Sequence, residues 1–217
     1  MRKEKTTKIN STKIYLIISF FLLLITILSK KMINDELIIS HFSDLFSIEQ
    51  IESYIESQKK REWLMFLFPP LIILIRSSLV AICLNIGLFF YDTENETKFK
   101  QLFRVALLGE FIFVLVGYFK FYYFVFIKTE YTLQNLQQFY PFSYTNFLDL
   151  NKIAPWLVYP LQTINLFEIG YFFVLVYGLH KLLKNKYAKS FEIVAVSYGT
   201  GLLIWLGLVS FLTLNIS

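Results

Sequence analysis

Five long apolar runs govern what this chain can fold into. Roughly 20 helical residues are needed to cross a hydrocarbon layer about 30 Å thick, and several of the runs reach that length. Lipid offers the backbone no hydrogen-bond partner, so each run is expected to be helical. The 217 residues are 56% hydrophobic and 17% charged, whereas soluble domains average about 25% charged residues. The sequence therefore predicts an all-α, polytopic membrane protein with a single integral membrane domain.

We expect five transmembrane helices, arranged as one signal-anchor helix followed by two helical hairpins. The first run is short, and a cleaved signal peptide is the alternative reading of it. No small-residue cleavage site follows the run, which favours a retained anchor. The expected transmembrane helices cover residues 14–28, 63–91, 102–127, 155–179 and 191–214.

Lysine and arginine in the connecting segments predict the orientation, because these residues collect on the cytoplasmic side of a membrane. The N-terminal tail, residues 1–13, and the two loops on its side hold eleven basic residues, against seven on the other side. We therefore expect a cytoplasmic N-terminus and a C-terminus outside, in the inner membrane if the protein is bacterial.

The two loops predicted to lie outside are longer than the cytoplasmic ones. In the first, residues 30–62, Ser47 and Gln50 have the spacing of a helix capping box. Apolar residues follow at helical intervals, which predicts an amphipathic helix over residues 47–60. This helix lies either on the membrane surface or on neighbouring helices, or else it is solvated and leads into the second span. The second loop, 128–154, is rich in aromatic residues and is expected to cap the bundle or contact the outer leaflet.

Ionisable residues inside the expected spans are costly and by default indicate function or pairing. Arg76 and Glu168 lie at similar depths, which predicts an ion pair, and Glu110 joins them only if its helix is offset or kinked. Lys120 is near a helix end and can reach the interface. The fourth span also carries polar residues at intervals of three after a kink expected at Tyr159–Pro160. The predicted intramembrane polar cluster comprises Arg76, Glu110, Gln162, Asn165 and Glu168.

Two interpretations of this cluster remain open. Its members line a polar path or ligand site, or they fix which helices are neighbours. Small residues recur at intervals of four or eight in the expected spans, for example Gly109/Gly117 and Ala195/Gly199, which is typical of close helix packing.

Catalytic and metal-binding motifs are absent from the sequence. His41 and His180 are assigned to opposite sides of the membrane, so they do not share a metal. The single cysteine, Cys83, excludes an internal disulfide framework, and an intramembrane transferase using it remains a minor hypothesis. We expect a protein that is not an enzyme, with no cofactor and no nucleic-acid partner.

The final stretch of the chain has an N-x-F-E-like helix start at Asn165, Phe167 and Glu168, a Gly178–Leu179 pair, a basic loop, and an A-x-x-V segment at Ala195. Together with five crossings, a basic cytoplasmic N-terminus and a C-terminus outside, this pattern resembles the Yip family of small polytopic membrane proteins. The resemblance covers roughly residues 65–213. The resemblance implies a five-helix membrane fold and, for eukaryotic members, vesicle traffic through Rab-type GTPases.

These features lead to two functional expectations. The first is a non-enzymatic scaffold or accessory protein of membrane transport or trafficking. It would bind lipid and either partner proteins or further copies of itself. The alternative is the membrane component of a small-solute transporter, permease-like, with the polar cluster as its intramembrane path.

Overall fold

The computed structural model describes residues 10–91 and 97–216, and this part of the chain is helical with no β-strand. The predicted all-α class is confirmed. The basic tail up to residue 9 and loop residues 92–96 lie outside the described residues. Five helices are long and apolar enough to cross a membrane. They are α1 (Ser11–Lys30), α4 (Leu64–Phe90), α5 (Phe99–Tyr122) with its π-helical continuation η1 (Tyr123–Ile127), α8 (Leu166–Leu183) and α9 (Tyr187–Ile216).

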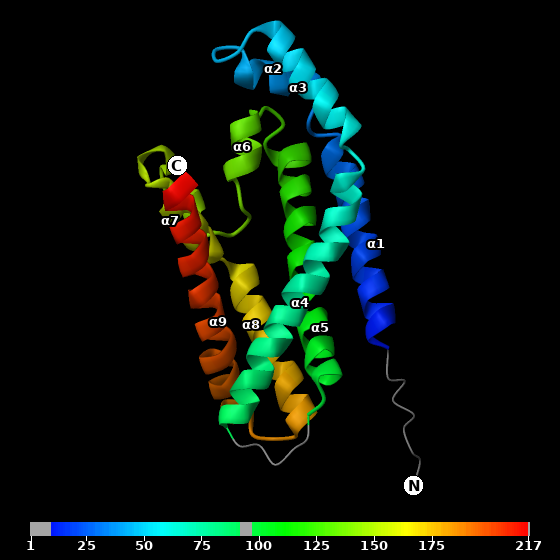
Figure 1. Ribbon diagram of the computed structural model, residues 1–217, viewed down its shortest axis with the longest axis vertical. Helices are drawn as coiled ribbons and strands as arrows, with labels where there is room; N and C mark the ends of the chain where they lie inside the picture. Colours follow the sequence, from blue (N-terminus) through cyan, green and yellow to red (C-terminus); the bar gives the residue numbers. More distant parts are fainter. Residues whose placement is uncertain (1–9, 92–96, 217) are drawn as a thin grey trace.

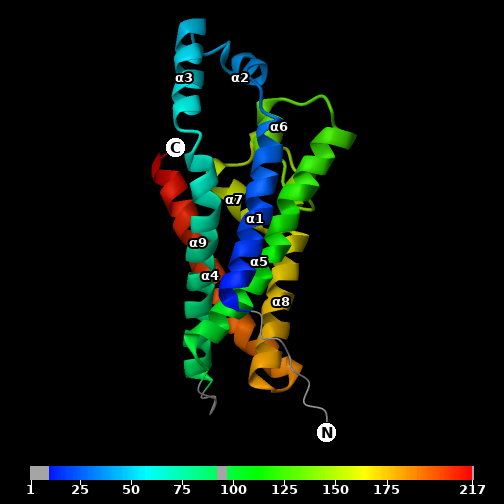
Figure 2. The ribbon, with the colours of Figure 1, turned by 90° about the vertical axis from the view of Figure 1, so that its right-hand side faces the viewer.

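The long helices run side by side, with α5 packed against α1, α4 and α8 (Figures 1 and 2). Helix α9 packs against α4 and α8. Helix α1 begins at the end of the bundle where α4 ends and α5 begins, whereas α9 ends toward the opposite end (Figure 1). This arrangement fits an odd number of crossings. Which end faces the cytoplasm stays a prediction.

The main core lies where α4, α5, α8 and α9 meet, and it is built from aliphatic side chains such as Leu84, Leu175 and Ile193. Glycine allows close approach at several of these contacts. A Cβ on Gly109 would lie 2.5 Å from the Tyr171 ring. Gly199, by contrast, has no neighbour within 4 Å of such a Cβ. The predicted close packing therefore holds at Gly109 and not at Gly199.

The outward faces of the long helices are strongly apolar. Large side chains on α4 and α9 are exposed on the bundle, among them Phe89, Phe90, Leu203 and Ile204. Such continuous apolar surface is abnormal for a protein in water and fits contact with lipid chains.

A helical hairpin stands at one end of the bundle, formed by α2 (Asp35–Phe42) and α3 (Ile48–Lys60) (Figures 1 and 2). We call it the α2–α3 lobe. The predicted capping box of Ser47 and Gln50 is present at the start of α3. Helix α3 packs against α2 and is followed after one turn by α4. Helix α3 thus both packs on a neighbouring helix and leads into the second span, so the two alternatives above stay open.

The predicted fourth span is interrupted. Helix α7 (Pro155–Thr163) continues through Pro160 and ends at Thr163, and α8 begins again at Leu166. The break therefore falls after the Tyr159–Pro160 site where a kink was expected. The segment before α7 contains α6 (Leu133–Gln138) and the short 3₁₀ helices η2 (Tyr144–Phe147) and η3 (Leu150–Lys152). It meets the break through an antiparallel bridge between Ser143 and Asn165.

Candidate functional site

The break between α7 and α8 is held by a compact set of hydrogen bonds around Asn165. Its Oδ1 accepts from the backbone N–H of Glu168 at 2.8 Å, which caps the start of α8. Its Nδ2 donates to the carbonyls of Gln162 and Thr163, both at 3.0 Å. Asparagine is among the best residues at a helix N-cap because its side chain replaces a missing backbone acceptor. The sequence folds this way because Asn165 satisfies both interrupted helix ends at once.

The α6–α7 segment supplies further partners for the broken backbone. Ser143 Oγ donates to the carbonyl of Gln162 at 3.1 Å. The N–H of Tyr144 donates to the carbonyl of Ile164 at 2.9 Å. Non-helical backbone at membrane depth is tolerated only where protein or trapped water satisfies it. These contacts provide that satisfaction.

The intervals of three predicted that Gln162, Asn165 and Glu168 lie along one continuous span, and this is wrong, because the helix does not continue through Ile164. Gln162 takes part through its backbone carbonyl. Asn165 acts as a cap, and Glu168 lies in the first turn of α8. The intervals of three were real in the sequence, but they joined residues on two separate helices.

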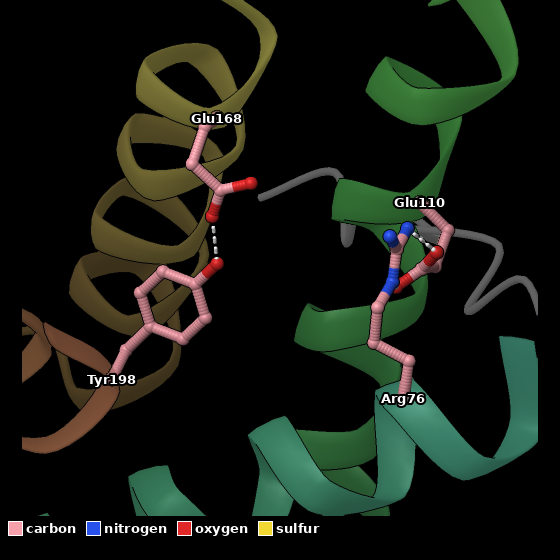
Figure 3. Close-up of polar contacts among 4 residues, drawn as sticks. All are labelled: Arg76, Glu110, Glu168 and Tyr198. Atoms are coloured by element: carbon pink, nitrogen blue, oxygen red, sulfur yellow. Dashed lines mark hydrogen bonds and ion pairs between the residues drawn. The ribbon is translucent and has the colours of Figure 1, made fainter. Parts of the chain in front are cut away.

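Arg76 on α4 and Glu110 on α5 form the ionic centre of the bundle (Figure 3). Arg76 Nε lies 3.0 Å from Glu110 Oε1, and Nη2 contacts Oε2, so the pair is bidentate. The Glu110 side chain is 1% exposed and the Arg76 side chain 39%. Both residues lie near the midpoints of their helices.

The predicted pairing of Arg76 with Glu168 is therefore wrong in its partner. Helix α4 packs directly along α5, which brings Arg76 to Glu110. Helix α5 also begins at Phe99, three residues before the predicted start at residue 102, so Glu110 lies deeper in its helix than expected. Counting depth from the predicted helix boundaries therefore named the wrong acid as the partner of Arg76.

Aromatic and hydroxyl groups complete the surroundings of the ion pair. The Arg76 guanidinium carbon lies 3.8 Å from the centroid of the Phe113 ring, a cation–π geometry. The hydroxyls of Ser77 and Tyr171 are fully buried and make no hydrogen bond of ordinary geometry. Both lie close enough to the Glu110 carboxylate to interact with it electrostatically.

Glu168 belongs to a second polar contact that faces the ion pair. The Tyr198 hydroxyl on α9 donates to Glu168 Oε1. Figure 3 shows the other carboxylate oxygen of Glu168 directed toward the side of the bundle that holds Arg76 and Glu110. Glu110 on α5 thus contacts the Arg76 guanidinium, whereas Glu168 on α8 acts on it through its charge alone.

Tyr140, in the segment between α6 and η2, lies in the field of this centre. Burial raises its pKa to about 12, and the charge of Glu168 adds a smaller contribution in the same direction. Tyr140 therefore remains neutral throughout the physiological range.

Other polar residues of the spans lie apart from the centre. Lys120 has no ion-pair partner among the described residues. His180 is at the end of α8, where its Nδ1 lies 2.7 Å from the carbonyl of Asn185. The described residues contain no group of three or more metal-ligating side chains. The site is a charge centre built around the Arg76–Glu110 ion pair.

Sequence reasoning missed Tyr198, Tyr171 and Ser143. The chain has 14 tyrosines, and nothing in the local sequence distinguishes the two that face carboxylates. Ser143 precedes Asn165 by more than twenty residues, so only the fold reveals their contact.

No family model, no curated protein and no solved structure matches this chain. The resemblance to the Yip family therefore stays a prediction from the residues quoted above. What the site does has to be argued from its geometry.

Proposed function

We propose that this protein is a non-enzymatic accessory or scaffold protein of a membrane. In this proposal it binds a partner protein through the α2–α3 lobe, while the five-helix bundle holds the lobe at the membrane surface. The observation that carries the proposal is an apolar groove on the lobe with acidic surroundings. The proposal includes a Yip-like arrangement of one anchor helix and two hairpins, with the N-terminus in the cytoplasm of a bacterial cell.

The lobe has an uneven distribution of charge. Between Met32 and Gln58 the chain contains acidic residues and no lysine or arginine. The basic residues lie at the base of the lobe, where Lys59 pairs with Asp35 at 2.8 Å and Lys30 pairs with Glu62. These ion pairs are exposed and individually weak, but they join the base of the lobe to its own helices and to α1. The acidic residues are Asp35, Glu36, Asp44, Glu49, Glu52 and Glu56.

Apolar side chains are exposed within the same acidic region. Leu45, in the turn between α2 and α3, is 72% exposed, and its neighbours Phe46 and Ile48 are also exposed. A groove of about 370 Å³ lies beside this turn. It is lined by Phe42, Phe46, Gln50, Ile51 and Tyr54.

These features indicate the chemistry of the partner. An exposed apolar groove rimmed by charge is typical of a surface that binds an amphipathic helix. Acidic residues around the groove favour a segment with lysine or arginine beside its apolar residues. The same acidic residues repel anionic lipid headgroups, which disfavours insertion of the lobe into the bilayer.

The test uses the full chain in nanodiscs of neutral lipid and a synthetic Leu/Lys amphipathic peptide as the probe. We expect the peptide to bind, with affinity falling as salt rises. The Glu49→Lys, Glu52→Lys variant should weaken binding by about tenfold, equivalent to about 1.4 kcal/mol. The control variant Ile204→Ala, altered on the lipid-facing surface of α9, should bind as the unaltered chain does. Equal binding of a Leu/Glu peptide, or no effect of the charge reversal, would contradict the proposal.

A second candidate function is supported by the break in the fourth crossing. In transporters, interrupted helices bind solutes near the middle of the membrane. Arg76 lies at such a depth and is 39% exposed, and a charged group there normally faces protein or a water-filled cavity. A permease-like component would use Arg76, Asn165 and Glu168 along its path. A folded Arg76→Met, Glu168→Met variant that supports normal solute uptake in cells would exclude this function.

A further inference from the structure

The charges at the centre of the bundle do not balance. Among the residues that the structure describes, Arg76 is the single cation at this centre, and two carboxyl groups, Glu110 and Glu168, face it (Figure 3). If both carboxyls were ionised, the centre would carry one net negative charge at the middle of the membrane. A lone charge at that depth is costly unless it is paired or neutralised.

The groups around Glu168 offer no second cation. It is approached by Tyr198 from α9, Tyr171 from its own helix, Arg76 from α4 and Glu110 from α5. Tyr140 from the α6–η2 segment is the remaining neighbour. Apart from Arg76, each of these is a neutral phenol or an acid. The balance has to come from a ligand.

The two carboxyls are not equivalent. Glu110 is held by both nitrogens of a bidentate guanidinium contact, which favours its ionised form. Glu168 accepts a hydrogen bond from the Tyr198 hydroxyl and lies in the first turn of α8. A helix N-terminus stabilises an anion only modestly. It is a weaker stabilisation than the charge-assisted, bidentate contact that Glu110 makes with Arg76.

The hydroxyls of Ser77 and Tyr171 add polar groups to the surroundings of Glu110. Their hydroxyl oxygens are buried without a hydrogen bond of ordinary geometry beside Glu110. Buried polar groups nearly always have partners. These two hydroxyls can donate hydrogen bonds to the ionised carboxylate of Glu110. The centre therefore has hydrogen-bond donors in addition to the guanidinium of Arg76.

We propose that Glu168 is a proton-binding site, which holds one exchangeable proton while Glu110 remains ionised against Arg76. The proton comes from water and bonds to a carboxylate oxygen of Glu168, so the net charge of the centre changes from minus one to zero. Tyr198 then donates to the neutral carboxyl. An alkali cation is disfavoured because Arg76 already directs its positive charge at the same space.

The proposal predicts proton counts for defined variants. Glu168→Gln removes the proton-binding carboxyl. Glu110→Gln leaves Arg76 with Glu168 as its sole acid, so Glu168 becomes ionised and the proton is again lost. Arg76→Gln leaves two carboxyls without a cation, so both become protonated. A purely structural contact between Glu168 and Tyr198 would not respond to the change at Glu110.

Infrared spectroscopy of the full chain in neutral-lipid nanodiscs measures this directly, through the C=O stretch of a protonated carboxyl. We expect the unaltered chain at neutral pH to show one such band, which is lost at high pH. The band should be missing in Glu168→Gln and in Glu110→Gln and doubled in Arg76→Gln. The control Glu49→Gln, changed on the exposed lobe, should keep the band.

Folding of every variant is checked by circular dichroism, and Tyr198→Phe provides a conservative second test. That variant should retain the band at a higher frequency, because the carbonyl loses its hydrogen-bond donor. A band that persists in Glu110→Gln, or no band in the unaltered chain at neutral pH, would overturn the proposal. A band that disappears when sodium replaces choline in the buffer would also overturn it, because the site would then bind a metal cation.

Discussion

Removing Arg76 alone should lower the free energy of unfolding more than removing Arg76 and Glu110 together. The change Arg76→Met leaves the Glu110 carboxyl, 1% exposed, without its cation. Removing one partner of a buried pair costs about 3–5 kcal/mol. Protonating an ordinary glutamate at pH 7 costs about 4 kcal/mol, from the difference between pH and a reference pKa near 4.3 at 1.36 kcal/mol per unit. Protonation of Glu110 therefore limits the damage. We expect Arg76→Met to lower the free energy of unfolding by about 3–4 kcal/mol.

Removing the acid and keeping Arg76 should lower the free energy of unfolding by a smaller amount. Glu110→Met leaves Arg76, whose side chain is 39% exposed and can turn toward Glu168. We expect a loss of about 1–3 kcal/mol, below the usual range for a fully buried charge. The double variant leaves neither charge unpaired at this contact, and its loss should be smaller than that of Arg76→Met alone. The coupling energy is then about 2–3 kcal/mol, above the average for interhelical polar contacts in membranes.

The assay is unfolding by a denaturing detergent, followed by tryptophan fluorescence, for the four proteins of the double-mutant cycle. Because the upper limit is set by protonation, the deficit of Arg76→Met should shrink as the pH falls toward 4, by about 1.4 kcal/mol per unit. Losses that simply add in the double variant would refute the reasoning, since they would show that the two side chains do not interact.

Three further predictions concern the packing and the break. Gly109→Val should destabilise the bundle by about 1–3 kcal/mol through overpacking against the Tyr171 ring, whereas Gly199→Ala should change the free energy of unfolding by less than about 0.5 kcal/mol; the same detergent titration measures both, and equal effects would contradict the packing described. Asn165→Ala should cost about 1 kcal/mol for the lost cap, with faster hydrogen exchange at the start of α8; unchanged exchange there would argue against the capped break. Tyr140 titrates near pH 12 in the folded chain and near 10 when unfolded, so folding stability should be constant below pH 10 and fall between pH 10 and 12; Tyr140→Phe should lessen that fall, and an identical alkaline profile would count against it.

The elements that sequence reasoning located are those fixed by local chemistry. Apolar runs long enough to cross lipid gave the five helices, because the backbone in lipid has no alternative to a helix. The capping box of Ser47 and Gln50 depends on residues three apart, and it was visible for the same reason.

The polar centre was predicted only in part, because its contacts join helices that are far apart in the sequence. The apolar surroundings made Arg76, Glu110 and Glu168 conspicuous, but which acid meets Arg76 depends on which helices are neighbours and where α5 begins. The break at Asn165 depends on Ser143, in a segment whose course no local pattern specifies. Pro160 was a misleading signal, because α7 continues through it and ends only at Thr163.

The most direct test of the account is the compartment faced by each end of the described chain. In a Cys83→Ser background, single cysteines at Thr12 and Asn215 are treated with a membrane-impermeant thiol reagent in intact cells and after lysis. The account predicts that Asn215→Cys is labelled in intact cells and that Thr12→Cys is labelled only after lysis. Labelling of both positions from one side would mean an even number of crossings, and it would remove the polar centre from the middle of the membrane.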